Sequence, residues 1–297
     1  MTSRPLPVIL SLPHGGLATP AEVVANLAID ATTIYNECDL WVDQLYDFAH
    51  ADLAGFVPDG YTAGTIATVS LPMARVLIDA NRDPNTLSNP DGPVKTQTSY
   101  GQPIYQQAID EVTQQQLLDK YWQPYHQTLE AVRHKQAEKA KLLLDCHNMA
   151  QHSPAAYDFP GAARPFICLA NLGDQQGEPL SQMGWTTCSA ELLRESGRIA
   201  ETLFADLALL EPVAGENVPI VALNWPFVGG YIIERYSQAT LTRPQIPTIM
   251  IEVNRGLFVG DQRTDTPIKP PNLAQIAKIR QRLYQWAAQV AMLLSER

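Results

Sequence analysis

The stretch LLLDCHNM (residues 142–149) joins three consecutive leucines to side chains that can bind metal or transfer protons. Residues 142–144 form a short apolar run of the kind found in the middle of a covered sheet. In an open α/β sheet, residues just past the carboxyl end of a strand line the ligand crevice. We therefore predict that Asp145, Cys146 and His147 lie at the functional edge of a sheet. For His147 taken alone, a hydrogen bond to a loop is the alternative.

Three further strand candidates end in comparable polar clusters. They are residues 6–12 (LPVILSL, followed by PHGG), residues 74–84 (ARVLIDANRDP) and residues 247–255 (PTIMIEVNR). Neighbouring strands bring such clusters together at one edge of a sheet. His14 and His147 with one carboxylate would give three protein ligands and leave a fourth position for water, which is the layout of a catalytic zinc site.

Strand and helix patterns alternate along the chain. Apolar residues at helical spacing predict helices at residues 39–55, about 103–141 (with or without a break near Pro124), 188–210 and 273–294. Further strands are expected at residues 65–71, 164–171 and 218–224, and a long surface loop at residues 86–102. This alternation predicts an α/β fold, a three-layer sandwich with a mixed, largely parallel central sheet flanked by helices. No repeat or composition break marks a linker, so we expect one domain over residues 1–297.

The composition limits the classes of partner. The chain is 45% hydrophobic and 18% charged with a formal net charge of −10, which is ordinary for a globular enzyme. An acidic surface argues against nucleic acid and anionic membranes, because both attract clustered lysine and arginine. The N-terminal apolar stretch is interrupted by Pro5, Pro7 and Pro13, so we expect neither a signal peptide nor a membrane span. The four cysteines form no CxxC pair, which favours reduced thiols and a cytoplasmic location.

Seven motifs of the chain resemble successive blocks of the N-formylglutamate amidohydrolase family. In order they are SLPHGG (11–16), ECDLWVDQLYDFA (37–49), RVLIDANRDP (75–84), YWQPYHQTL (121–129), LLLDCHNM (142–149), GGYIIERY (229–236) and IEVNRGLF (251–258). The resemblance implies a zinc-carboxypeptidase-like fold and hydrolysis of an amide on a small acidic substrate, with N-formyl-L-glutamate giving formate and L-glutamate. Family members often carry serine where this chain has Gly15, Ala74 and Asn148, so the chain resembles a divergent member.

The resemblance also implies one zinc ion per chain, held by His14, His147 and an acidic residue at the start of the first helix. Asp39 matches that acidic residue best, and Glu37 is the alternative. A carboxylate is favoured at a helix N-terminus in any case, so a plain N-cap is the other interpretation of Asp39. Asp145 is expected either to orient His147 or to cap a turn.

Two charged residues are candidates for the catalytic step. Glu252 ends an apolar strand, where a buried carboxylate is costly unless it is paired or functional, and we predict that it is the general base. A structural ion pair with Arg75 or Arg255 is the alternative for Glu252. Arg75 is expected to polarise the scissile carbonyl or to bind a second carboxylate, unless it is a surface residue of its strand.

Four residues are predicted to bind substrate. Asn81 and Arg82 resemble the Asn-Arg pair with which zinc carboxypeptidases bind the carboxylate of their substrate, a task that suits a guanidinium group. Gly230 lets the backbone approach a ligand, and Tyr231 offers a hydrogen bond. The aromatic residues of YWQPYH are assigned to packing and His126 to a solvated helical face.

Two other functions stay open at this point. One is a carboxypeptidase or deacylase that acts on another N-acyl amino acid or a short peptide; the missing compact HxxE motif after His14, where the chain reads HGGL, weighs against it. The other is a non-catalytic ligand-binding relative, which a missing ligand or base would favour. Neither a GxSxG motif nor a P-loop is present, which disfavours serine hydrolases and nucleotide hydrolases. The oligomeric state does not follow from the sequence.

Overall fold

A computed structural model describes residues 4–155, 157–212, 218–237, 246–263 and 265–295. Its centre is a six-stranded sheet with the strand order β2-β1-β3-β6-β4-β5. The strands are β1 (Arg4–Leu12), β2 (Tyr61–Ser70), β3 (Leu142–Met149), β4 (Ile167–Ala170), β5 (Val221–Leu223) and β6 (Thr248–Asn254). Neighbouring strands are parallel except for β4 and β6, which are antiparallel. The predicted mixed, largely parallel sheet is confirmed.

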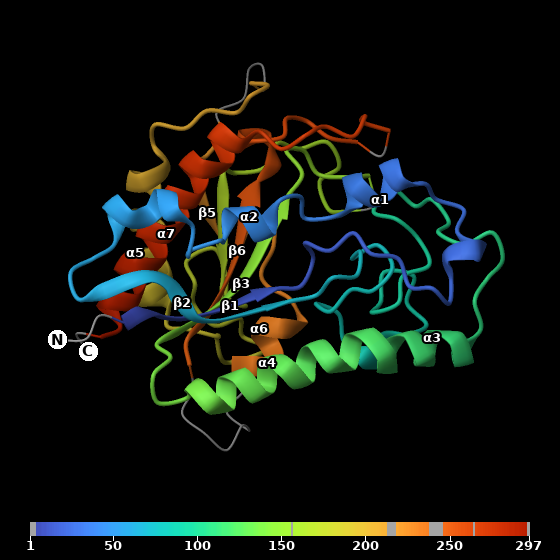
Figure 1. Cartoon of the computed structure of the whole chain (residues 1–297), viewed down its shortest axis with the longest axis horizontal. Helices are drawn as coiled ribbons and strands as arrows, with labels where there is room; N and C mark the ends of the chain where they lie inside the picture. Colours follow the sequence, from blue (N-terminus) through green and yellow to red (C-terminus); the bar gives the residue numbers. More distant parts are fainter. Residues whose placement is uncertain (1–3, 156, 213–217, 238–245, 264, 296–297) are drawn as a thin grey trace.

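The helices lie on both faces of this sheet (Figure 1). They are α1 (Ala31–Glu37), α2 (Val42–Leu45), α3 (Glu111–Leu117), α4 (Gln123–Gln136), α5 (Ala190–Phe204), α6 (Tyr231–Ser237) and α7 (Leu273–Leu293), with the short turns η1 (Val24–Asn26), η2 (Ala51–Phe56), η3 (Pro84–Thr86), η4 (Leu118–Trp122) and η5 (Arg255–Leu257). On one face, Leu142 and Leu144 of β3 belong to the same core as α2, α5 and α7. On the other face, Leu143 packs in a core with α3, α4 and α6. This alternation gives the predicted three-layer arrangement.

The strand β3 extends further than the sequence indicated. The prediction ended it at Leu144, whereas it continues through Asp145, Cys146 and His147 to Met149, with all eight residues buried. Polar side chains are tolerated inside this strand because they have partners; the Oδ1 atom of Asp145, for example, accepts a hydrogen bond from the Ser11 hydroxyl at 2.8 Å. His147 lies opposite Glu252 of β6 in the register of the sheet.

The predicted helix over residues 39–55 is wrong. The segment forms only the single turn α2 and the 3-10 turn η2, and a left-handed backbone at Trp41 (φ 57°) separates α2 from Asp39. The apolar residues at helical spacing are nevertheless buried in one core; they are Leu40, Val42, Leu45, Phe48 and Leu53. Their spacing therefore indicated that these side chains are buried, but it did not indicate a continuous helix. The helix α1 was not predicted.

The predicted strand over residues 74–84 is also wrong. Ala74 and Ile78 make only isolated bridges, to Gly16 and Val94. Between them the chain turns, because the N–H groups of Leu77 and Ile78 both donate to the carbonyl of Ala74. Its apolar side chains are buried without strand pairing.

The long helix expected at residues 103–141 begins at Glu111 and ends at Gln136. Pro124 does not break it, because the π-helical turn η4 directly precedes α4 and Pro124 lies in the first turn of α4. A proline is accommodated there because the widened turn leaves room for its ring and does not need a hydrogen bond from the N–H group that proline lacks. Among the described helices, none is long and apolar enough to cross a membrane.

Candidate metal centre and catalytic cavity

Three buried side chains from separate parts of the chain meet at the carboxyl end of β1 and β3. His14 follows β1, His147 lies in β3, and Asp39 lies between α1 and α2, where its N–H donates to the carbonyl of His14 at 3.1 Å. The Nδ1 atoms of the two histidines are 3.0 Å apart. The Oδ2 atom of Asp39 is 3.0 Å from Nδ1 of His147 and 3.5 Å from Nδ1 of His14.

This arrangement fits a metal ion. Ligand atoms that lie 2.0–2.1 Å from a tetrahedral zinc are about 3.3 Å from one another, close to the three separations found here. The other ring nitrogens face carboxylates: Nε2 of His14 is 2.7 Å from Asp79, and Nε2 of His147 is 2.9 Å from Asp145. Each carboxylate can keep the proton of its histidine on Nε2. The unprotonated Nδ1 atoms of both rings then face one point, where they could donate their lone pairs to a metal ion.

The charges of the group favour cation binding. Burial acts to raise the pKa of Asp39, but hydrogen bonds to His14 and His147 lower it well below its ordinary value. Burial acts to lower the pKa of His147, but the charge of Asp145 and the hydrogen bond to it raise the pKa well above its ordinary value. The centre thus favours a proton on His147, and a metal ion would compete with that proton.

Asp79 was missed as an orienting residue by the sequence reasoning. Its carboxylate is fully buried and accepts hydrogen bonds from Nε2 of His14 and from the N–H of Asn81 at 2.9 Å. It also pairs with Lys95 at 3.2 Å and with Arg75 at 3.3 Å. The sequence signal was present, because LIDANR places a carboxylate directly after an apolar run, as LLLDCH does.

Glu252 lies beside the metal-capable group on β6 and lines the cavity in front of it. Burial raises the pKa of its carboxyl group to about 7, although the neighbouring charge of His147 lowers the pKa. A carboxyl group with this pKa can accept and release a proton near neutral pH, which a general base that later acts as an acid must do.

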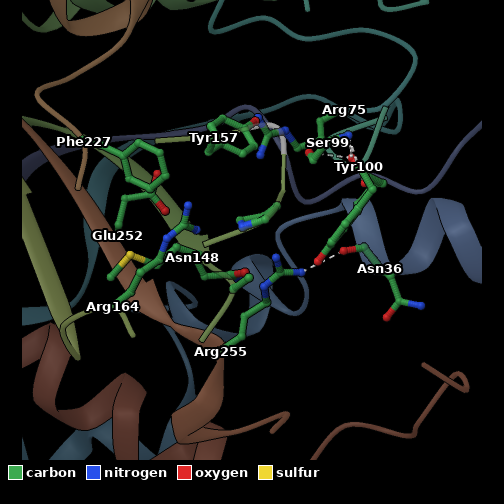
Figure 2. A pocket seen from close by; sticks show the side chains of 14 residues that line it. Asn36, Arg75, Ser99, Tyr100, Asn148, Tyr157, Arg164, Phe227, Glu252 and Arg255 are labelled. Atoms are coloured by element: carbon green, nitrogen blue, oxygen red, sulfur yellow. Dashed lines mark hydrogen bonds between the residues drawn. The ribbon is translucent and has the colours of Figure 1, made fainter. Parts of the chain in front are cut away.

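The cavity has a volume of about 250 Å³, and its lining includes His14, His147, Arg75, Arg82, Arg164 and Glu252. A smaller hollow of about 40 Å³ adjoins it and shares Arg75, Tyr157, Arg164, Phe227 and Glu252 with it. Figure 2 shows the side chains of this second hollow, which adds Asn36, Ser99, Tyr100 and Arg255. Together the two hollows offer a site of mixed polar and apolar lining, with several arginines next to the metal-capable group.

Arg75 and Arg82 are both engaged with carboxylates. Arg75 lies in a turn and not on a strand as predicted; its guanidinium is 3.7 Å from Asp39 and 3.3 Å from Asp79. Arg82 donates from Nη2 to the Asp91 carboxylate at 2.7 Å and from Nε to the Asp91 carbonyl at 3.0 Å. Both line the larger cavity, so each faces the cavity while being held by the protein.

The remaining predicted binding residues lie next to one another. Asn81 donates to Oδ2 of Asp145 at 3.1 Å and accepts from the N–H of Ile232 at 2.8 Å. Gly230 has to be a glycine, because an added Cβ would lie 2.5 Å from the amide of Asn81. The Tyr231 hydroxyl accepts from Arg235 at 3.0 Å, and Tyr231 is not among the described residues that line either hollow.

Three further assignments can be compared with the structure. Glu37, the alternative metal ligand, is not part of the His14–Asp39–His147 group, and its carboxylate accepts from the N–H and hydroxyl of Ser99. The solvated position predicted for His126 is wrong, since it is buried and lies within hydrogen-bonding distance of the Ala80 carbonyl and the Tyr236 hydroxyl. The aromatic residues Trp122 and Tyr125 are buried, as the packing assignment predicted.

The fold and the site define an α/β protein with a buried histidine–aspartate–histidine group that could hold a metal ion at the carboxyl edge of its sheet. A protein-family model described as N-formylglutamate amidohydrolase matches residues 6–259, and the chain therefore belongs to that family. The predicted family is thus confirmed.

A search of solved structures gives the same fold. The crystal structure of N-formylglutamate amidohydrolase from Ralstonia eutropha JMP134 matches with a TM-score of 0.66 over 99% of this chain and 96% of that chain. The two sequences are 19% identical, so this similarity establishes the fold. A comparison with curated proteins found no significant match.

Proposed function

We propose that this chain is a zinc-dependent amidohydrolase that converts N-formyl-L-glutamate to formate and L-glutamate. The observation that carries the proposal is the convergence of two histidine Nδ1 atoms and one carboxylate oxygen beside Glu252 in the same cavity. Membership of the N-formylglutamate amidohydrolase family supports the reaction class. Family membership supports a small acidic substrate, and the composition supports a cytoplasmic enzyme that binds neither nucleic acid nor membrane.

His14, Asp39 and His147 would hold one zinc ion per chain, and Asp79 and Asp145 would keep the two imidazoles in the required orientation. When bound, zinc supplies Lewis acidity, which activates water near neutral pH and polarises an amide carbonyl. Both histidines and Asp39 are almost completely buried, so competition from bulk water is limited to the cavity.

Glu252 moves the proton in this proposal. Its carboxylate accepts a proton from the water that attacks the formyl carbon, and it then delivers that proton to the amide nitrogen of the leaving glutamate. The pKa of about 7 that burial gives this carboxyl group suits both steps. Arg75, held between Asp39 and Asp79, directs its positive charge toward the carbonyl oxygen as negative charge develops there.

One carboxylate of the substrate is assigned to Arg82, which lines the cavity and lies two residues before the turn η3. Asn81 acts by fixing Asp145, and Gly230 acts by leaving room for the Asn81 amide. Tyr231 contributes its backbone N–H, which lies 3.4 Å from the Asn81 carbonyl. These roles make Asn81 and Gly230 supports of the site, with Arg82 as the group that reaches substrate.

The proposal is tested by a hydrolysis screen on the purified chain together with metal analysis. The substrates are the N-formyl, N-acetyl and N-succinyl derivatives of glutamate and of neutral amino acids. We expect N-formyl-L-glutamate to be hydrolysed fastest, a chelator to abolish the reaction and added zinc to restore it. A preference for another acyl group would favour a different deacylase. No hydrolysis by a zinc-loaded chain would favour a ligand-binding relative.

A further inference from the structure

Arg164 is a buried arginine of the cavity that the sequence reasoning did not identify. Its backbone is fixed by hydrogen bonds from its N–H to the Gln151 carbonyl and from Asn254 to its own carbonyl, at 3.0 and 2.9 Å. The side chain lies with its guanidinium carbon 4.9 Å from the centre of the Phe227 ring and 5.9 Å from that of Tyr157. Only 4% of the residue is exposed. The guanidinium is therefore held in a defined place.

Unlike the other two arginines of the cavity, Arg164 has no carboxylate partner among the described residues. Arg75 pairs with Asp39 and Asp79, and Arg82 pairs with Asp91. Within the described residues no carboxylate forms an ion pair with Arg164, its buried Nε has no hydrogen-bond partner, and its Nη2 reaches only the Ser153 hydroxyl at 3.4 Å. Burial lowers the pKa of Arg164 to about 10, so it is still a cation at neutral pH.

A buried cation without a counter-ion is costly, and a ligand that supplies one would remove that cost. A ligand in either hollow would reach Arg164, because the residue lines both the larger cavity with the metal-capable group and the smaller hollow. In Figure 2 it lies beside Glu252 and Phe227 at the wall of the hollow. Glu252 contributes a nearby negative charge but forms no ion pair with Arg164, and Glu37 in the same hollow is bound to Ser99.

We propose that Arg164 binds the side-chain carboxylate of the substrate and thereby selects a dicarboxylic amino acid. The inference rests on the proposed function of the site, but not on the identity of the acyl group. The α-carboxylate of an N-acyl amino acid is attached to the carbon that bears the scissile nitrogen, so it stays near the reacting group. The side-chain carboxylate of glutamate lies about three bonds from that carbon and can reach a separate cation. A guanidinium can bind that carboxylate through two parallel hydrogen bonds.

The first experiment measures binding of L-glutamate and L-glutamine by calorimetry, since these amino acids differ only in the group that Arg164 is proposed to contact. We expect wild type to prefer L-glutamate by about tenfold or more, which is typical of one charge-assisted contact. Arg164→Met should remove the preference. Arg133→Met is the matched control, because Arg133 is also buried, also lies over an aromatic ring and also has an unpartnered Nε, but lies in α4.

The second experiment compares kcat/KM for N-formyl-L-glutamate and N-formyl-L-glutamine. Arg164→Met should lose about tenfold or more on the glutamate substrate, mainly through KM, and little on the glutamine substrate. Arg164→Lys keeps the charge without the guanidinium and should recover part of the preference; it also serves if Arg164→Met does not fold.

The outcomes separate the two proposals. An unchanged preference in both Arg164 variants, or no preference in wild type, overturns the role of Arg164 even if N-formyl-L-glutamate is hydrolysed. A preference that depends on Arg164, without hydrolysis of N-formyl-L-glutamate, supports the role of Arg164 and overturns the proposed reaction. An equal loss of preference in Arg133→Met also contradicts the inference, because a buried arginine outside the cavity would then have the same effect.

Discussion

Replacing Asp79 by asparagine should weaken metal binding although Asp79 is not a proposed ligand. The carboxylate accepts from Nε2 of His14 at 2.7 Å and from the N–H of Asn81 at 2.9 Å, and it pairs with Lys95 and Arg75. All these partners donate, so one of them would face the amide N–H₂ of the new asparagine. Loss of such a partner to a metal-binding histidine typically lowers metal affinity about 10- to 100-fold. By the usual conversion this is about 1.4–2.7 kcal/mol.

The variant should also be less stable. Removing one member of a buried charge network costs about 3–5 kcal/mol, and we expect the lower end because Lys95 keeps Asp91 as a partner. Zinc affinity is measured by competition with a chromophoric chelator and stability by urea unfolding. Asp91→Asn is the matched control, since Asp91 also contacts Lys95 but forms no hydrogen bond with His14 among the described contacts. Wild-type zinc affinity in Asp79→Asn would refute the orienting role. Equal loss in both variants would assign the effect to the charge network instead.

Three further predictions concern separate parts of the molecule. Glu252→Gln should retain zinc and lower kcat by about 100-fold or more; near-normal turnover would exclude it as the base. Arg82→Ala should lower kcat/KM by about 10- to 100-fold only for substrates with the carboxylate it contacts, and equal losses on all substrates would show that it acts through Asp91. Burial acts to raise the pKa of Asp52, but its hydrogen bonds with Arg280 lower it. Asp52→Asn should therefore lower the free energy of unfolding above about pH 4, and this difference from wild type should disappear as the pH falls below that value. A loss that is independent of pH in acid titrations of urea unfolding would contradict this assignment.

Much of the fold could be predicted because its central strands are buried on both faces. Residues 142–144 and 249–251 are apolar without alternation, which fits the middle of a covered sheet. The same apolar pattern failed at residues 74–84, where residues 76–81 are also buried but the chain turns and makes no strand ladder. Burial is reflected in the apolar composition of a segment. The choice between strand and turn depends here on which backbone hydrogen-bonding groups of the neighbouring segments are left unpaired.

The site was predictable where motifs carried it. His14 and His147 follow or end apolar runs, and the resemblance to the family favoured Asp39 over Glu37; the structure brings these three together. No motif of this kind identified Arg164. Its role depends on the loop between β3 and β4, which folds so that the side chain lies against Phe227, far away in the sequence. Arg164 has no carboxylate partner among the described residues. This is a property of the folded chain, and no local sequence pattern predicts it.

The central claim is that His14, Asp39 and His147 form one zinc site that is required for amide hydrolysis. The most direct test is the zinc content of purified wild type and of His147→Ala, measured by mass spectrometry after saturation with zinc and removal of excess metal, with circular dichroism to verify folding. The account predicts one zinc per chain in wild type, and a folded variant that has lost both the metal and the hydrolysis of N-formyl-L-glutamate. A folded His147→Ala protein that retains one zinc per chain, or that hydrolyses the substrate at the wild-type rate, would contradict it.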